Sequence, residues 1–261
     1  MKRTMLIACL AIASVAFAAK KITPEAEVKA TTTIIAPTPS PTPSPTPSPA
    51  PPPAAVVLAD VNSTSALYNS LQLEAAGLNQ TIFEKAMQGF TKLCNAGKIL
   101  TTNKITIVDF SQPSSQKRLY VIDLETKKIL FHSLVSHGRN TGGLWAKSFS
   151  NQPESFKSSP GFYVTAETYN GGNGYSLRLD GLEKNINDNA RSRAIVMHGA
   201  PYANESSINA LGFLGRSQGC PALPQSLHKP VINTIKNGTC LFIYTPDESY
   251  VKQSFLLSTS A

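Results

Sequence analysis

A histidine and a cysteine in residues 194–223 are the side chains of this sequence best suited to chemistry. His198 ends a strand-like apolar run, and Cys220 follows the turn-rich segment G-R-S-Q-G at 215–219. A thiol becomes a good nucleophile when a base takes its proton, and imidazole is the usual base near neutral pH. The pair indicates a cysteine nucleophile with a histidine base. It equally suits a small buried thiol and a hydrogen-bonded core histidine, and spacing alone does not separate the two interpretations.

The turn before Cys220 supplies further groups that thiol chemistry needs. Gly219 permits a tight turn, and the backbone amides of Gly219 and Cys220 are candidates for an oxyanion hole. Arg216 adds a positive charge nearby, which favours a thiolate. Pro221 donates no hydrogen bond and fixes the exit from the turn.

The sequence lacks the motifs of a serine hydrolase and of a zinc enzyme. The sequence has no G-x-S-x-G, and Ser217 is followed by a better nucleophile. The four histidines form no H-E-x-x-H, and the four cysteines form no C-x-x-C. We therefore expect neither a metal nor a cofactor.

The elements that would position the pair are mainly strands. Short β-type runs separated by Asp, Asn, Gly, Ser and Pro predict a mainly antiparallel β domain with a few helices, an α+β class. Long loops are expected at 138–160 and 200–220, where function usually lies. The predicted strands are Ile105–Phe110, Arg118–Leu124, Lys128–Val135, Phe162–Thr168, Ser176–Leu179, Ala194–His198 and Cys240–Tyr244.

Helices are predicted before and after these strands. Helical spacing predicts one over residues 66–73 and a second from Asn79 or Thr81 to Gly97. A late helix is expected between Pro230, in its first turn, and Gly238, at its end.

The N-terminus carries export signals. Lys2 and Arg3 precede an apolar run that finishes in A-F-A at 16–18, which is typical of a signal peptide cleaved after Ala18. We therefore expect an exported protein of the periplasm or cell envelope. Cys9 ends L-I-A-C, which resembles a lipobox, so lipidation is the alternative.

Composition changes sharply after the signal peptide. Ten of the 19 prolines fall within Pro37–Pro53, in a T-P-S-P repeat. Such a run buries no core and favours polyproline II, with a reach of ~3.1 Å per residue. Residues 19–55 are predicted as a disordered linker, which would act as a stalk near a membrane or as a plain leader.

Charge and cysteine count narrow the partners. The formal net charge is +8, with Lys and Arg scattered rather than clustered, so no nucleic-acid partner is expected. A diffuse positive field suits an anionic polymer or a membrane surface.

With Cys9 discounted, three cysteines leave at least one free thiol, best assigned to Cys220. Cys94 and Cys240 are expected to be two buried free thiols, with a disulfide between them as the alternative.

The two motifs around the pair, H-G-A from His198 and G-R-S-x-G-C-P-A-L around Cys220, resemble a branch of the L,D-transpeptidase (YkuD-like) catalytic domain family. The resemblance covers residues 65–245. Further matching segments, in order along the chain, are D-F-S at 109–111, R-L-Y at 118–120, V-S-H-G-R-N at 135–140, S-F-S-N at 148–151, S-S-P-G-F-Y at 158–163, S-L-R-L-D-G at 176–181 and A-R-S-R-A-I-V at 190–196.

The resemblance implies a β-sandwich or barrel domain with an N-terminal helical pair, acting on peptidoglycan stem peptides. In this family a cysteine, here Cys220, attacks a tetrapeptide stem. A histidine, here His198, serves as base. Release of the terminal D-alanine leaves an acyl-enzyme, and an amine of a second stem resolves it into a 3→3 cross-link. Ser217 and Arg216 would shape the turn or touch substrate.

The resemblance also implies boundaries. We expect a helical segment at 56–100 that packs on a catalytic domain at 101–247, and a C-terminal tail at 248–261. The N-terminal segment would hold the domain near a membrane, and nothing in the sequence addresses oligomeric state.

Two departures put the grip on substrate in doubt. The family often has His where this chain has Gln218, and Arg where it has Ala222. The substrate carboxylate must then meet another cation, for which the candidates are Arg216, Arg139 and Arg178.

Other histidines and a glycine complete the expected site. His137 is expected to line the groove, or else to stabilise a turn, and Gly199 is expected beside the substrate. His132 and His228 are expected to be structural.

Two alternative functions remain open. Water could resolve the acyl-enzyme, which would make an L,D-carboxypeptidase or an endopeptidase. A non-catalytic cell-wall-binding domain is the other, although the intact His198 and Cys220 pair disfavours it.

Overall fold

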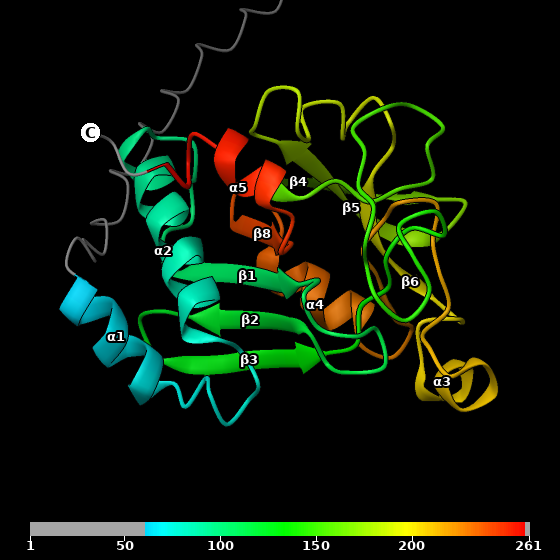
Figure 1. The fold of residues 1–261 in the computed structure, drawn as a ribbon, viewed down its shortest axis with the longest axis horizontal. Coiled ribbons are helices and arrows are strands. Elements are labelled where there is room, and N and C mark those ends of the chain that lie inside the picture. Colours follow the sequence, from blue (N-terminus) through cyan, green and yellow to red (C-terminus); the bar gives the residue numbers. More distant parts are fainter. Residues whose placement is uncertain (1–60, 259–261) are drawn as a thin grey trace, which may run out of the picture. The chain divides into compact units, whose positions relative to one another are not determined.

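An eight-stranded sheet organises the computed structural model of the protein, which describes residues 61–258 (Figure 1). The strand order is β3-β2-β1-β8-β4-β5-β6-β7, and neighbours are antiparallel except for the parallel pairs β1–β8 and β6–β7. The strands are β1 Lys104–Asp109, β2 Leu119–Asp123, β3 Lys128–Ser133, β4 Gly161–Gly171, β5 Gly174–Gly181, β6 Val196–Ala200, β7 Ala222–Pro224 and β8 Cys240–Tyr244. The predicted fold class, mainly β with a few helices, is confirmed.

Five helices accompany the sheet within the described residues. They are α1 Val61–Ser70, α2 Gln80–Asn95, α3 Glu205–Leu211, α4 His228–Ile235 and α5 Glu248–Gln253. Asn79 caps α2, because its side chain accepts a hydrogen bond from the Thr81 N–H at 2.8 Å. The expected N-terminal helical pair is thus present as α1 and α2.

Both faces of the central strands are buried, as the alternation of side chains shows. Ile105 and Ile107 of β1 face one hydrophobic cluster with α1 and α2, whereas Val108 faces a second cluster with α4. Side chains alternate across a strand, so a strand covered on both faces must be apolar throughout. Helices cover both faces of this part of the sheet (Figure 1).

The contact of α2 with the sheet depends on a glycine. A Cβ atom at Gly89 would lie 2.1 Å from Cζ of Phe162. Without that atom, α2 can approach β4 and β8 closely, and the Phe162 and Phe242 rings stack beneath it with centroids 4.2 Å apart.

The two ends of the sheet are bridged by the chain that leaves β3. The Ser136 N–H donates to the Ala222 carbonyl at 2.8 Å, and the Ser217 N–H donates to the His137 carbonyl at 2.9 Å. Residues 136–139 therefore bind the segment that leads into β7, and the sheet is nearly closed. The Cys220 turn lies in this closing region.

Three elements were not predicted: α3, β7 and α5. The loop expected at 200–220 contains α3, and β7 was not predicted. Residues 248–258, expected as a tail, form α5 and a turn whose Leu256 and Leu257 join the cluster under α2. Cys94 and Cys240 are free thiols, but only Cys240 is fully buried.

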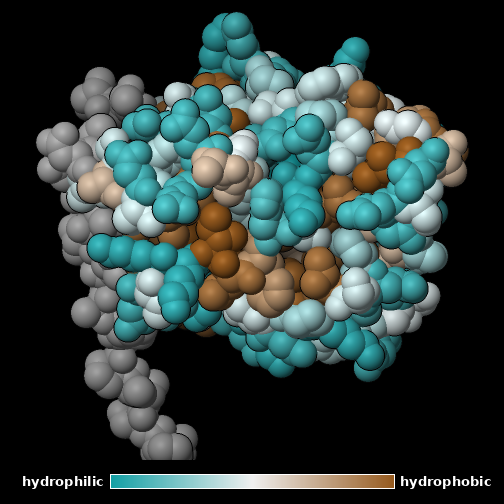
Figure 2. Space-filling view, turned by 90° about the horizontal axis from the view of Figure 1, so that it is seen from below, coloured by the Kyte–Doolittle hydropathy of each residue, from teal (hydrophilic) through white to brown (hydrophobic). Residues whose placement is uncertain are grey.

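The described surface offers no long apolar element. None of the helices within residues 61–258 has the length and hydrophobicity to cross a membrane. Viewed from below, the described residues are mostly hydrophilic, with hydrophobic residues gathered near the middle and toward the upper right of that face (Figure 2). The expected signal peptide, the lipobox at Cys9 and the proline-rich linker lie outside the described residues.

Candidate active site

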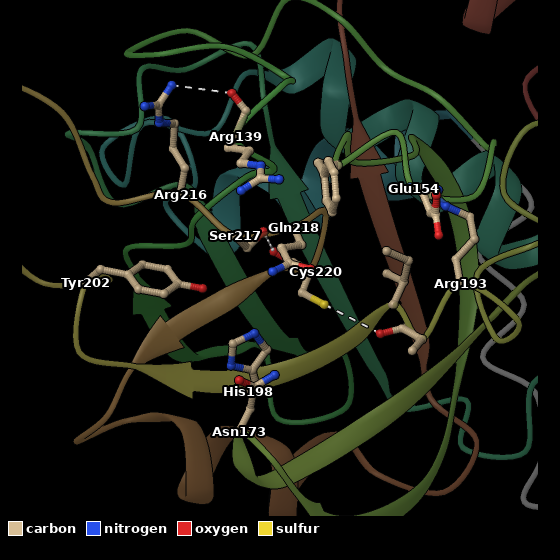
Figure 3. A pocket seen from close by; sticks show the side chains of 13 residues that line it. Arg139, Glu154, Asn173, Arg193, His198, Tyr202, Arg216, Ser217, Gln218 and Cys220 are labelled. Atoms are coloured by element: carbon tan, nitrogen blue, oxygen red, sulfur yellow. Dashed lines mark hydrogen bonds between the residues drawn. The ribbon is translucent and has the colours of Figure 1, made fainter. Parts of the chain in front are cut away.

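A pocket of about 540 Å³ opens over the β6–β7 end of the sheet (Figure 3). Its walls come from the loop at 139–156, the β4–β5 turn, the start of β6 and the Cys220 turn. The lining residues are Arg139, Glu154, Phe156, Asn173, Arg193, Ala194, Ile195, His198, Tyr202, Arg216, Ser217, Gln218 and Cys220.

The parallel pairing of β6 with β7 brings His198 and Cys220 together. His198 pairs with Ala222, and Cys220 lies two residues before Ala222, in the bend that leads into β7. The Val196 N–H reaches the Cys220 Sγ at 3.5 Å, and both side chains face the pocket (Figure 3).

His198 is oriented by its own strand. Its Nδ1 lies 3.0 Å from the Gly199 carbonyl oxygen, which can only accept, so Nδ1 carries the proton. The Nε2 lone pair is thereby free to take a proton. Burial, and then the nearby His228, lower the pKa of His198, so the ring is neutral near pH 7.

Cys220 is 9% exposed, and its burial raises the pKa of the thiol. The Val196 N–H and the positive charge of Arg193 act in the opposite direction. The thiol donates weakly to the Ala194 carbonyl at 3.7 Å. Both shifts favour the uncharged forms, a thiol on Cys220 and an imidazole on His198.

Ser217 holds the turn that presents Cys220. Its hydroxyl accepts from the Gly219 N–H at 3.0 Å and donates to the Cys220 carbonyl at 2.7 Å. Gly219 has φ +125°, and a Cβ there would lie 2.8 Å from the Lys157 carbonyl oxygen. The Gly219 amide, expected as an oxyanion donor, is engaged by Ser217, which leaves the Cys220 amide as the candidate.

Arg139 and Arg216, expected to bind the substrate carboxylate, both line the pocket. The Arg216 Nη1 donates to the Arg139 carbonyl at 3.3 Å and to the Gly142 carbonyl at 3.2 Å. The Arg139 guanidinium lies 3.9 Å from the centre of the Phe156 ring. Both guanidinium groups are held without an acidic partner among residues 61–258.

Arg178 and Gly199 do not line the pocket. Arg178 is paired with Glu167 at 3.1 Å on the outer surface of β4 and β5. Gly199 packs against His228, whose Nδ1 would lie 2.5 Å from a Cβ at that position. Gly199 contributes the carbonyl that orients His198.

His137 is fully buried and also lies outside the pocket lining. Its Nδ1 accepts from the Arg118 Nη2 at 2.8 Å, so its Nε2 carries the proton and donates to the Gly142 carbonyl at 3.3 Å. Burial, followed by the charge of Arg118, lowers the pKa of His137 to about 4. The ring supports the segment that binds Ser217.

Arg193 and Tyr202 are pocket residues that the sequence did not single out. Arg193 stands just before β6 and donates to the Ser150 and Lys157 carbonyls at 2.8 and 2.7 Å. These partners are 36 or more positions away in the chain, so no local pattern points to them. The only sequence signal was the A-R-S-R-A-I-V segment that contains Arg193.

Solved structures with a similar arrangement include three L,D-transpeptidases. The chain is 12% identical to one from Mycobacterium smegmatis, with 55% of this chain and 59% of that one covered and a TM-score of 0.35. It is 16% identical to one from Mycobacterium tuberculosis H37Rv, with 55% of this chain and 58% of that one covered and a TM-score of 0.33. It is 13% identical to residues 123–326 of one from Xylanimonas cellulosilytica, with 59% of this chain and 69% of that one covered and a TM-score of 0.32. The matched part spans under two thirds of the two mycobacterial chains.

No curated protein matches the sequence. A family model described as L,D-transpeptidase catalytic domain matches residues 74–244, which is more than half of the chain and includes His198 and Cys220. The chain therefore belongs to the L,D-transpeptidase catalytic domain family.

Proposed function

We propose that this chain is a cysteine-dependent peptidoglycan L,D-transpeptidase in which Cys220 is the nucleophile and His198 its base. The observation that carries the proposal is the pairing of β6 with β7. It places the buried thiol of Cys220 and the oriented imidazole of His198 in the lining of the same pocket. Family membership supplies the class of reaction, and the site supplies residues with suitable roles.

The proposed first half-reaction follows from these groups. Cys220 attacks the carbonyl of the third residue of a tetrapeptide stem while its proton passes to His198 Nε2. The Cys220 amide stabilises the oxyanion. The imidazolium then returns the proton to the amine of the departing D-alanine, and an acyl-enzyme remains.

The second half-reaction reverses the roles. The side-chain amine of a second stem attacks the thioester carbonyl, His198 takes a proton from that amine, and Cys220 leaves as the thiol. The product is a 3→3 cross-link. If water attacks instead, the enzyme is an L,D-carboxypeptidase or an endopeptidase, and acceptor access decides between these outcomes.

The same proposal places the enzyme outside the cytoplasm. Residues 1–18 act as a signal peptide, residues 19–55 as a linker, and 56–100 as a helical segment on the catalytic domain at 101–247. The residues from 248 follow as a C-terminal segment. Peptidoglycan is the partner, and the N-terminal segment keeps the domain near the membrane.

The test is incubation of the full chain with defined tetrapeptide muropeptides, with products identified by mass. A dimer with a 3→3 bond is expected, and tripeptide alone would identify the hydrolytic alternative. Cys220→Ala must abolish both products and the covalent adduct with a carbapenem. Activity of Cys220→Ala equal to that of the unchanged chain would overturn the assignment, and binding without turnover would indicate a cell-wall-binding domain.

A further inference from the structure

Five of the six arginines of the described residues fall into two groups, and the sixth, Arg118, is buried beside His137. Arg178 and Arg191, on and beside β5, pair with acids: Glu167 contacts both, and Asp180 contacts Arg191. By contrast, Arg139, Arg193 and Arg216 line the pocket, and none of them forms an ion pair within residues 61–258. The pocket thus holds three of the four arginines that form no ion pair within residues 61–258.

Each of these three guanidinium groups is held in place by neutral groups. Arg193 is half-buried, and its two Nη atoms donate to two carbonyls and two serine hydroxyls of the 150–159 loop at 2.6–3.1 Å. Arg216 donates to two carbonyls, and Arg139 lies on the Phe156 ring. A guanidinium has five N–H groups in a fixed plane. Arg193 donates four of them to the loop and keeps its Nε–H for a ligand, whereas Arg139 and Arg216 keep several.

The three charges lie on two sides of the nucleophile. Arg139 and Arg216 lie together on the Tyr202 side of Cys220, and Arg193 lies on the Glu154 side (Figure 3). Glu154 is the one acid of the lining and is exposed. The positive field around Cys220 is therefore two-sided.

We propose that the pocket holds two carboxylate subsites, one at Arg193 and one at Arg139 with Arg216, which flank the scissile bond. The inference rests on the proposed function and deepens it. The preferred donor peptide has a free carboxylate on each side of the bond that Cys220 attacks. A peptide in which either carboxylate is amidated is a poor donor.

The chemistry of the two groups explains the selection. A carboxylate accepts charge-assisted hydrogen bonds from a guanidinium, one from the Nε–H of Arg193 and a bidentate pair where two N–H groups are free, and these are roughly twice as strong as neutral ones. A carboxamide has no charge and turns N–H donors toward the N–H groups of the arginine. Loss of one such contact lowers kcat/KM by about tenfold to a hundredfold.

The test compares three synthetic tetrapeptide stems as donors for the full chain. One stem has all carboxylates free, a second has the terminal carboxylate amidated, and a third has the acyl-side carboxylates amidated. The enzymes are the unchanged chain, Arg193→Gln, the double variant Arg139→Gln/Arg216→Gln, and Arg178→Gln as a matched control outside the pocket. The measurements are kcat/KM for each combination of enzyme and stem, and the mass of the Cys220 acyl-enzyme.

The expected pattern is a crossed one. The unchanged chain and Arg178→Gln prefer the free stem over each amidated stem by tenfold or more. For Arg193→Gln, kcat/KM is the same for the free stem and for one of the amidated stems. For the double variant, kcat/KM is the same for the free stem and for the other amidated stem. Arg178→Gln must react with every stem about as well as the unchanged chain does.

Two results separate the possible failures. If the unchanged chain acylates Cys220 with all three stems equally well, or if the variants lose activity evenly on all of them, the subsites do not exist while the proposed function stands. If no stem acylates Cys220, the proposed function itself fails.

Discussion

Burial in the pocket moves the pKa values of Cys220 and His198 in opposite directions, up for the thiol and down for the imidazole. Each shift favours the uncharged form, so the two side chains do not form a thiolate–imidazolium ion pair before substrate binds. In the proposed mechanism, the thiol becomes nucleophilic as its proton passes to His198 during attack. That proton transfer would set the pH dependence of the reaction.

The acid limb of kcat/KM should lie below pH 6.5. His198 must be neutral to accept the proton, and its lowered pKa keeps it neutral at pH values below the usual range. Because His228 helps to lower that pKa, His228→Gln should move the acid limb to higher pH. Stopped-flow acylation across pH 4–8 measures the shift.

The control for that shift is His132→Gln, since His132 stacks on Tyr120 outside the pocket. Its profile should match that of the unchanged chain. An acid limb that stays in place in His228→Gln would show that the group being titrated is not His198.

Ser217→Ala should slow acylation and lower stability. The change removes an acceptor from the Gly219 N–H and a donor from the Cys220 carbonyl, both of which are buried. Leaving such groups unpaired costs about 1–3 kcal/mol. We expect a lower melting temperature together with at least tenfold slower adduct formation on Cys220.

Ser226→Ala, at an exposed position after β7, is the matched control and should change neither value. A Ser217→Ala variant that melts normally and acylates at the normal rate would show that the hydroxyl does not hold the turn.

The residues of the site differ in how far the sequence could reveal them. His198 and Cys220 stand in compact motifs, so they were predicted. Arg193 and Tyr202 reach the pocket through contacts with segments distant in the chain, and no local spacing encodes those. His137 stands in a motif too, but only the surrounding Arg118 and Phe110 show that it supports the site from beneath.

At the scale of elements, His137 links the end of β3 to the start of β2. Its pKa of about 4 in the folded protein lies below the usual value of 6.5. Between these values the unfolded chain binds the proton and the folded protein does not. Stability therefore falls as pH drops from 6.5 toward 4, by up to about 3 kcal/mol from this residue.

Thermal melts between pH 7 and pH 4 measure that fall. His137→Asn is expected to be less stable at pH 7 but to show a shallower dependence on pH. An equally steep dependence in that variant would assign the acid sensitivity to other groups.

Gly89→Ala should weaken the packing of α2 on the sheet. Alanine normally favours a helix, but here its Cβ would collide with the Phe162 ring, and overpacking costs about 1–3 kcal/mol. We expect a lower denaturation midpoint. Gly172→Ala, where a Cβ meets nothing within 4 Å, should keep the midpoint of the unchanged chain.

The elements themselves were predictable to different degrees. The apolar runs of β1, β2 and β8 are long enough to define strands, and Asn79 marks the start of α2. β7 has three residues and exists through its pairing with β6. α3 has no buried residue, so it shows no apolar stripe, and only its cap at Asn204 signalled a helix.

At the scale of the whole molecule, the C-terminal segment belongs to the same core as α2. Leu256 is 2% exposed, and Tyr250 and Ser254 donate to the buried carboxylate of Glu183, which also accepts from the Phe162 N–H at 2.8 Å. This carboxylate joins the end of the chain to β4. The last described residues thus stabilise the sheet that carries the site.

Leu256→Ala should therefore destabilise the whole domain by about 2–5 kcal/mol, the range for a buried leucine. The neighbouring Phe255 is 58% exposed, so Phe255→Ala should cost little. Chemical denaturation of the full chain compares the two variants. Equal midpoints would show that the segment does not contribute to the core.

The bridge between residues 136–139 and the segment leading into β7 has a consequence for how the enzyme becomes reactive. It joins parts of the chain about 80 positions apart, and such distant contacts form late because they require much of the chain to be ordered first. The turn that presents Cys220 is held by these contacts, so a half-folded molecule has the thiol without the pocket around it. Assembly of the site thus coincides with completion of the fold.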